Sequence, residues 1–91
     1  KTEESQLEQA LTYRLEAMKY YRADKLAEAL DKIELAVKIN PDDPQSWYER
    51  GLVQEAQGSI KAAQSDFQEC LKRAPLHGRT RHKLSVEPAT N

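Results

Sequence analysis

Apolar side chains recur every three or four residues through most of this chain, the spacing that places them on one face of an α-helix. The pattern predicts four full helices, near residues 5–22, 25–39, 44–57 and 59–73, and a short fifth helix over about 78–87. In the first helix Leu7, Leu11 and Met18 recur with Ala10 and Ala17 alongside them. Few residues are β-branched and many are Ala, Leu, Glu, Gln or Lys, so an all-α fold is predicted.

Proline, glycine and short polar residues separate these helices. Pro41 cannot continue the helix that precedes it, and Asp43 can cap the next one. Gly58 ends the third helix, Ser59 can cap the fourth, and Pro75 marks the end of the fourth. The breaks therefore divide the chain into two helical pairs and a remainder.

The second helical pair repeats the first with a period of 34 residues. When the chain is shifted by 34, large side chains meet large ones and small side chains meet small ones. The matched residues are Tyr13 with Trp47, Ala17 with Gly51, Asp24 with Gly58, Leu26 with Ile60, Ala29 with Ala63, Ile33 with Phe67, Ala36 with Cys70, Val37 with Leu71 and Pro41 with Pro75. A chance helical hairpin would show periodicity within each helix but not this agreement between pairs.

The period and the matched residues resemble the tetratricopeptide repeat family. The resemblance rests on Trp47, Gly51, Gly58, Ile60, Ala63, Phe67, Cys70, Leu71 and Pro75. It implies a right-handed superhelix of antiparallel helix pairs. We expect a single domain over 1–91, with one repeat over about 10–43, a second over about 44–77, a cap helix over about 78–87 and a loose tail over 88–91.

Packing explains why a repeat needs small and large residues at fixed places. We expect Ala17 or Gly51 to face an alanine of the partner helix, so that the two helices approach closely. Tyr13, Tyr20 and Trp47 are expected in the core by their repeat positions. Arg81 falls where Tyr13 and Trp47 lie in the earlier repeats, so the fifth helix is interpreted as a polar cap.

The overall charge excludes some classes of partner. Charged residues make up 32% of the chain, but the net charge of −1 gives no general attraction to nucleic acid or to a membrane. No apolar run approaches the ~20 residues that a membrane span needs. The single cysteine excludes an internal disulfide. A soluble, cytoplasmic protein is favoured, and Lys at position 1 suggests a processed chain or a domain cut from a longer one.

Residues with catalytic or metal-binding chemistry are few. Cys70 matches Ala36 in the repeat, so we expect a small buried side chain with no histidine near it. His77 and His82 are five residues apart and fall on different helix faces, so no metal site is predicted. The glycines are scattered and form no phosphate-binding loop. We expect no cofactor and no catalytic activity.

The chain is basic only near its end. Residues 1–76 carry 11 basic and 14 acidic side chains, whereas residues 77–91 carry three basic and one acidic. This run can be a solvated cap helix, a rim that attracts an acidic peptide, or a nucleic-acid contact. No aromatic residues interleave with its charges, which disfavours the nucleic-acid interpretation.

In the family that the chain resembles, the first helix of each pair lines a concave groove that binds a peptide or a helix of a partner protein. The resemblance places the following residues in that groove: Arg14, Met18, Tyr21, Arg22, Gln45, Tyr48, Glu49, Leu52, Glu55, Arg79, His82 and Lys83. For Tyr21 and Tyr48, a core position and a groove position are equally open.

One subclass of the family clamps the carboxylates at the C-termini of chaperones. Arg14, Arg79 and Lys83 supply charge at three of its positions, but Met18 and Glu49 stand where the clamp has asparagine. Because Glu49 would repel a carboxylate, such a clamp is not favoured.

The expected function is that of a non-catalytic protein-interaction module. The alternative is a structural segment that self-associates or joins other parts of a longer chain. A homo-oligomer through the first helix is suggested by Leu7, Ala10 and Leu11, which extend its apolar stripe beyond the length that one repeat requires. The identity of the partner does not follow from the sequence.

Overall fold

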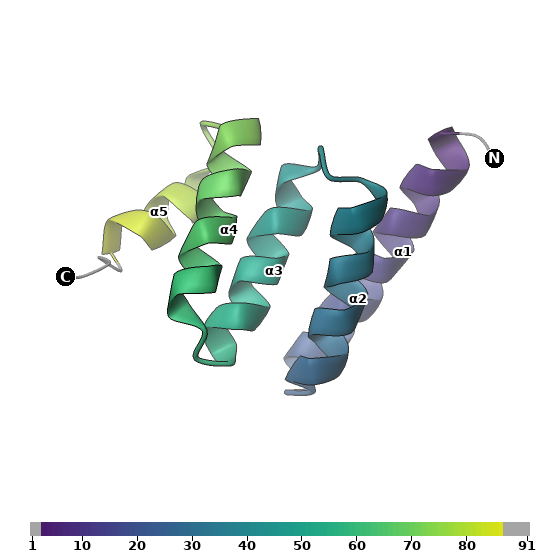
Figure 1. Cartoon of the computed structure of the whole chain (residues 1–91), viewed down its shortest axis with the longest axis horizontal. Coiled ribbons are helices and arrows are strands. Elements are labelled where there is room, and N and C mark those ends of the chain that lie inside the picture. The colour runs from purple at the N-terminus through teal and green to yellow at the C-terminus, as the bar shows by residue number, and fades with distance from the viewer. Residues whose placement is uncertain (1–2, 87–91) are drawn as a thin grey trace.

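The computed structural model describes residues 3–86, apart from the side chains of residues 3, 85 and 86. Within this range the chain forms five helices: α1 (Glu3–Arg22), α2 (Leu26–Ile39), α3 (Pro44–Ala56), α4 (Ile60–Arg73) and α5 (Gly78–Val86) (Figure 1). The predicted helices are confirmed, with boundaries that differ by at most two residues. The expected tail over 88–91 lies outside the described residues.

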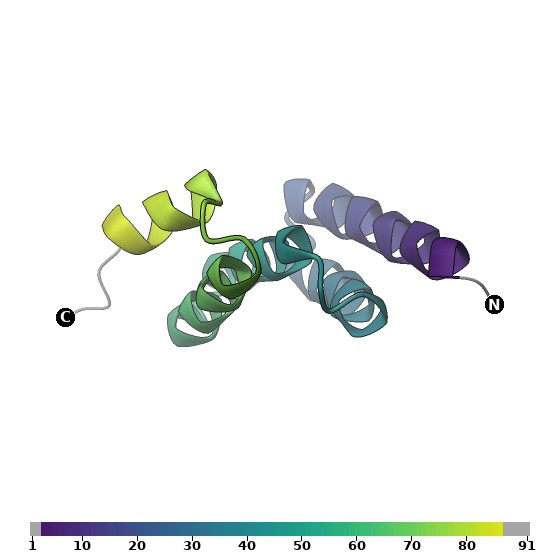
Figure 2. The same ribbon diagram turned by 90° about the horizontal axis from the view of Figure 1, so that it is seen from above.

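The helices pack as two antiparallel pairs, α1 with α2 and α3 with α4, and the pairs stack where α2 meets α3. The short helix α5 packs on α4. Figure 2 shows α1 and α5 rising on either side of α3, while α2 and α4 lie on the opposite side. The surface bordered by α1, α3 and α5 is called the concave face below. The fold is therefore the all-α stack of helix pairs that the repeat predicts.

The turns inside the two pairs have the same backbone geometry. Asp24 and Gly58, which are 34 residues apart, both adopt a positive φ, of 62° and 87°. In each turn the next residue donates a backbone hydrogen bond five residues back, from Lys25 to Tyr20 and from Ser59 to Gln54. This bond closes the end of the helix by the Schellman pattern. The repeat thus extends to the backbone of its turns.

The helix starts agree only in part with the predicted caps. Asp43 caps α3, because its Oδ1 accepts a hydrogen bond of 3.0 Å from the backbone N–H of Gln45. Ser59 stands at the equivalent place before α4, but its side chain makes no capping hydrogen bond. The prediction for Ser59 was therefore wrong, although the position of the helix start was right.

Each pair of helices contributes its own core cluster. The first consists of Ala17, Ile33 and Ala36. The second consists of Tyr48, Ala63, Phe67 and Cys70. Ile33 and Phe67 occupy the same repeat position, as do Ala36 and Cys70, so the 34-residue match predicted these core positions correctly. Tyr48 has no counterpart in the first cluster.

Gly51 lies in close contact with the partner helix of the second pair. A Cβ atom built on Gly51 would overlap Cε1 of Phe67 and lie 2.7 Å from Cδ1 of the same ring, well inside van der Waals contact. The nearest side chain is therefore Phe67, one turn after Ala63, the alanine expected to face Gly51. In the first pair the corresponding residues are Ala17 and Ile33, so the larger ring in the second pair is matched by a smaller partner residue.

The aromatic residues expected in the core by repeat position are only half-buried: Tyr13, Tyr20 and Trp47. Cationic side chains lie over two of these rings, and Nζ of Lys32 is 5.5 Å from the ring centroid of Tyr13. The guanidinium carbons of Arg50 and Arg73 lie 4.9 and 4.4 Å from the Trp47 ring centroid, and the indole Nε1 donates to the carbonyl oxygen of Pro41 at 2.8 Å. Such cation–π contacts let an aromatic side chain remain at the edge of a core.

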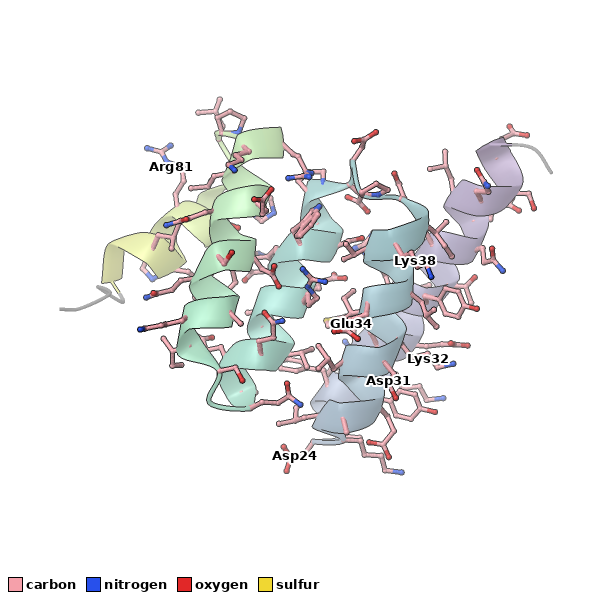
Figure 3. All side chains as sticks on the ribbon, viewed as in Figure 1. Asp24, Asp31, Lys32, Glu34, Lys38 and Arg81 are labelled. Carbon is pink, nitrogen blue, oxygen red and sulfur yellow. The ribbon has the colours of Figure 1, made fainter. Side chains whose placement is uncertain are left out.

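An ion pair joins the two helices of each pair at the same repeat positions, with its charges reversed. Glu16 of α1 pairs with Lys32 of α2 at 3.3 Å. Arg50 of α3 pairs with Asp66 of α4 at 2.7 Å, and its hydrogen bonds with Asp66 raise the pKa of Arg50. Lys32 lies on the outer surface of the first pair (Figure 3). Reversed charges at matched positions favour pairing within each hairpin over exchange of helices between hairpins.

We predict that Gly51→Ala lowers the free energy of unfolding by about 1–3 kcal/mol, because the new methyl group would overpack the buried ring of Phe67. Denaturant unfolding followed by circular dichroism measures the change. Gly78→Ala is the matched control, since a Cβ there meets no atom within 4 Å. Equal stability of both variants and the wild type would contradict the close approach.

Candidate functional site

The residues predicted to line the groove all lie on the three helices that border the concave face. Helix α1 carries Arg14, Met18, Tyr21 and Arg22; α3 carries Gln45, Tyr48, Glu49, Leu52 and Glu55; α5 carries Arg79, His82 and Lys83. The structure shows which of these side chains are accessible and which are engaged within the molecule.

Arg14 is held in a two-point ion pair with Glu49. Its Nε and Nη2 donate to the two carboxylate oxygens of Glu49 at 2.9 and 3.1 Å, and its Nη1 lies 3.5 Å from Oδ2 of Asp43. The hydrogen bonds with Glu49 raise the pKa of Arg14. Glu49 is buried, and Gln45 Nε2 also donates to it at 3.2 Å. The pair therefore ties α1 to α3 instead of offering a free charge to a partner.

A second set of polar contacts continues from Gln45 to α5. Gln45 Oε1 lies 2.9 Å from Nε2 of His77, and the backbone N–H of Thr80 donates to Nδ1 of His77 at 3.3 Å. Because a backbone N–H can only donate, Nδ1 is the acceptor and Nε2 carries the proton given to Gln45. His77 thus caps the start of α5, a role that the sequence alone did not indicate.

Thr80 connects this histidine to the cysteine. Its fully buried hydroxyl lies 2.9 Å from Nδ1 of His77 and 3.2 Å from Sγ of Cys70. The expectation that no histidine lies near Cys70 was therefore wrong, because the turn before α5 brings His77 back over α4. Burial raises the pKa of the Cys70 thiol, which disfavours the reactive thiolate. The available sequence signal was that Ser46, 34 residues before Thr80, also carries a short hydroxyl side chain, and the structure buries it equally.

Tyr48 is a core residue. It is only 7% exposed, and its ring centroid lies 5.8 Å from that of Phe67 and 5.1 Å from that of His77. Burial raises the pKa of its phenol, while the charges of Arg79 and Lys83 act in the opposite direction. Of the two positions left open for Tyr48, the structure gives the core one. Tyr21 is half-buried.

Lys83 is also engaged within the molecule. Its Nζ lies 2.6 Å from Oε1 of Glu55, which joins α5 to α3. Two of the three cations considered for a carboxylate clamp, Arg14 and Lys83, thus have carboxylate partners of their own. A partner's terminal carboxylate would have to displace them.

The accessible part of the concave face combines apolar and cationic side chains. Met18, Tyr21 and Leu52 are half-buried, and Met18 and Leu52 pack against the first and second core clusters. Arg22, Arg79 and His82 are exposed. Arg79 is close enough to Tyr48 for its charge to act on the phenol. The face therefore suits a segment with apolar side chains and neighbouring acidic groups.

One hollow in the described range lies away from the concave face. It has a volume of about 330 Å³ and is lined by Gln6, Leu7, Ile39, Asn40, Pro41 and Asp42. It therefore lies between the first turns of α1 and the α2–α3 turn. No side chains of residues 4–84 gather three or more His, Cys, Asp or Glu in a possible metal site. No helix within 3–86 has the length and apolar character needed to cross a membrane.

Comparison with protein families matches most of the chain to a known family. The family model described as tetratricopeptide repeat covers residues 18–86. No curated protein matches the sequence.

We predict that Glu49→Gln lowers the free energy of unfolding by about 1–3 kcal/mol, because Arg14 would lose its charged acceptor in a partly buried site. Glu16→Gln, which removes the more exposed pair with Lys32, should cost less than about 1 kcal/mol. Urea unfolding of both variants measures the difference. Equal losses of unfolding free energy in the two variants would show that the pair of Arg14 and Glu49 stabilises the fold no more than the exposed pair does.

We predict that the fold becomes less stable as the pH rises above about 9. Burial raises the pKa of Cys70 from its ordinary value of 9.0 and that of Tyr48 from 10.0. The stability that these neutral groups contribute is present below those values and is lost as the pH rises through the folded-state pKa.

Urea midpoints measured from neutral to alkaline pH test this prediction. Tyr48→Phe combined with Cys70→Ala should reduce the loss of stability at alkaline pH relative to wild type. Cys70→Ala introduces the residue that the first repeat has at the same position, Ala36. An unchanged alkaline loss in the double variant would contradict the assignment.

Proposed function

The chain belongs to the tetratricopeptide repeat family, and we propose that it is a protein-interaction module whose concave face holds a segment of a partner protein. The family generally serves protein–protein interaction and is typically non-catalytic. We divide the chain accordingly into repeats over about 10–43 and 44–77, followed by the cap helix.

The proposal rests on one observation: some residues of the concave face are held in internal ion pairs or buried, and the others remain accessible to a partner. Arg14, Glu49 and Lys83 are held in internal ion pairs, and Tyr48 is buried. The apolar surface of Met18, Tyr21 and Leu52 remains partly accessible, with exposed Arg22 on α1 and Arg79 and His82 on α5. We infer that these six residues form the contact surface.

The charge of this surface indicates the chemistry of the partner segment. Cations on α1 and α5 flank an apolar centre, so the segment we propose carries apolar residues between acidic ones. A chaperone tail held only by its terminal carboxylates is disfavoured. Arg14 and Lys83 already have carboxylate partners, and Glu49 and Met18 stand where the clamp has asparagine.

The alternative function, a structural segment that self-associates or joins other parts of a longer chain, is favoured by a different observation. Leu7, Leu11 and Leu15 of α1 are exposed, and none of them belongs to either core cluster. This feature concerns the outer side of α1 and is compatible with a partner segment on the concave face.

We predict that Arg79→Glu weakens partner binding by about 1–3 kcal/mol, because it places an acid beside the proposed acidic segment. Affinity capture with quantitative mass spectrometry compares the variant with wild type. Calorimetry with a synthetic peptide from the captured partner then measures the affinity.

Arg81→Glu is the matched control on the same helix. Arg81 is exposed and points away from the body of the molecule (Figure 3). Equal binding by the Arg79 variant and wild type, or equal weakening by both substitutions, would contradict the proposed surface.

A further inference from the structure

The outer side of α1 occupies repeat positions that are covered in the later repeats. Ser46 of α3 and Thr80 of α5 are fully buried, whereas Thr12, their counterpart in α1, is exposed. Glu49 of α3 pairs with Arg14 of α1, and Lys83 of α5 pairs with Glu55 of α3. Each later first helix therefore uses this side to contact the helix one repeat before it.

In α1 the corresponding position is taken by an apolar residue. Leu15, the counterpart of Glu49 and Lys83, is 62% exposed, and Leu11, one turn before it, is 47% exposed. Single exposed leucines are ordinary, but these two adjoin each other on a side that the repeat covers elsewhere. Figure 1 shows α1 at the edge of the molecule, at the opposite end from α5.

Charged residues lie on both sides of these two leucines along α1, at equal distances from the midpoint between them. Glu4, Leu11, Leu15 and Arg22 follow one another at intervals of seven, four and seven residues, which keeps all of them on one side of a helix. The pattern is symmetric about residue 13, with an acid at one end and a base at the other. Glu8 and Lys19 add a second acid and base at the same ends.

These four charges are not used within the described part of the molecule. The ion pairs found between its side chains involve Arg14, Glu16, Lys32, Asp43, Glu49, Arg50, Glu55, Asp66, Glu69, Lys72, Arg73 and Lys83. Glu4, Glu8, Lys19 and Arg22 make none of these pairs, and all four are exposed. They are therefore available to a second molecule, although Arg22 also belongs to the contact surface proposed above and could serve only one of the two contacts at a time.

We propose that a second copy of this chain packs on α1, with the two α1 helices antiparallel about a twofold axis near residue 13. In this arrangement Leu11 of each copy meets Leu15 of the other. Glu4 meets Arg22, and Glu8 meets Lys19, on both sides of the axis. A twofold interface brings the same surface together twice, so one symmetric stripe supplies both halves of the contact.

The charge pattern favours this antiparallel pair of α1 helices over other ways in which two copies could associate. A parallel pair would place acid beside acid and base beside base, which is unfavourable. A head-to-tail contact would have to seat α1 against the other end of the molecule, where α5 already covers α4.

Analytical ultracentrifugation from low to high micromolar concentration tests association of the wild-type chain. We expect the sedimentation coefficient to rise with concentration towards that of a dimer. Leu11→Glu combined with Leu15→Glu should remain monomeric while retaining the helical circular dichroism of the wild type, since both leucines are exposed. A wild-type chain that stays monomeric throughout would overturn the proposal.

A charge exchange tests the antiparallel arrangement. One variant carries Glu4→Lys and Glu8→Lys, and the other carries Lys19→Glu and Arg22→Glu. Each alone should dimerise about tenfold or more weakly than wild type, because like charges would meet across the interface. An equal mixture should form a heterodimer, since each facing pair then joins an acid of one variant to a base of the other.

Asp31→Lys, on the exposed side of α2, is the control for a change in net charge and should leave dimerisation unchanged (Figure 3). Native mass spectrometry with one variant isotopically labelled detects the heterodimer. A mixture that shows no heterodimer, or variants that dimerise as strongly as wild type, would overturn the antiparallel pairing.

Discussion

The close approach of helices within each pair is the constraint on which the rest of the structure depends. Gly51 leaves room for the ring of Phe67, and Ala17 does the same for Ile33 in the first pair. Closely packed protein interiors tolerate little added volume, so these residues fix the distance between the two helices of each pair. Fixed pairs in turn set where α1, α3 and α5 border the concave face.

Polar contacts between repeats then decide which side chains a partner can reach. The pair of Arg14 and Glu49 joins α1 to α3, while His77 and Thr80 connect α5 to α3 and α4. Buried polar groups of this kind are costly unless every member is satisfied, so they fix the relative positions of the helices. They also withdraw charges from the concave face, which leaves Arg22, Arg79 and His82 as its exposed basic groups.

Much of the fold could be predicted from the sequence, because the 34-residue match fixes which positions are small and which are large. Ile33, Phe67 and Cys70 lie in the core as expected, and the helix boundaries agree closely. The candidate site was less predictable. Whether Tyr48 and Glu49 face a partner or the core depends on how one repeat rests on the next. Likewise, His77 reaches Thr80 only through the geometry of a turn, which helical periodicity does not encode.

We propose the concave face as the binding surface for a partner segment. The most direct test is an NMR titration of the isotopically labelled chain with a peptide from a captured partner. A segment bound on the concave face should produce the largest amide shifts at Tyr21, Leu52 and Arg79, with little change at Lys38 of α2 and Lys61 of α4. Shifts concentrated on α2 and α4, with the first three amides unmoved, would contradict it.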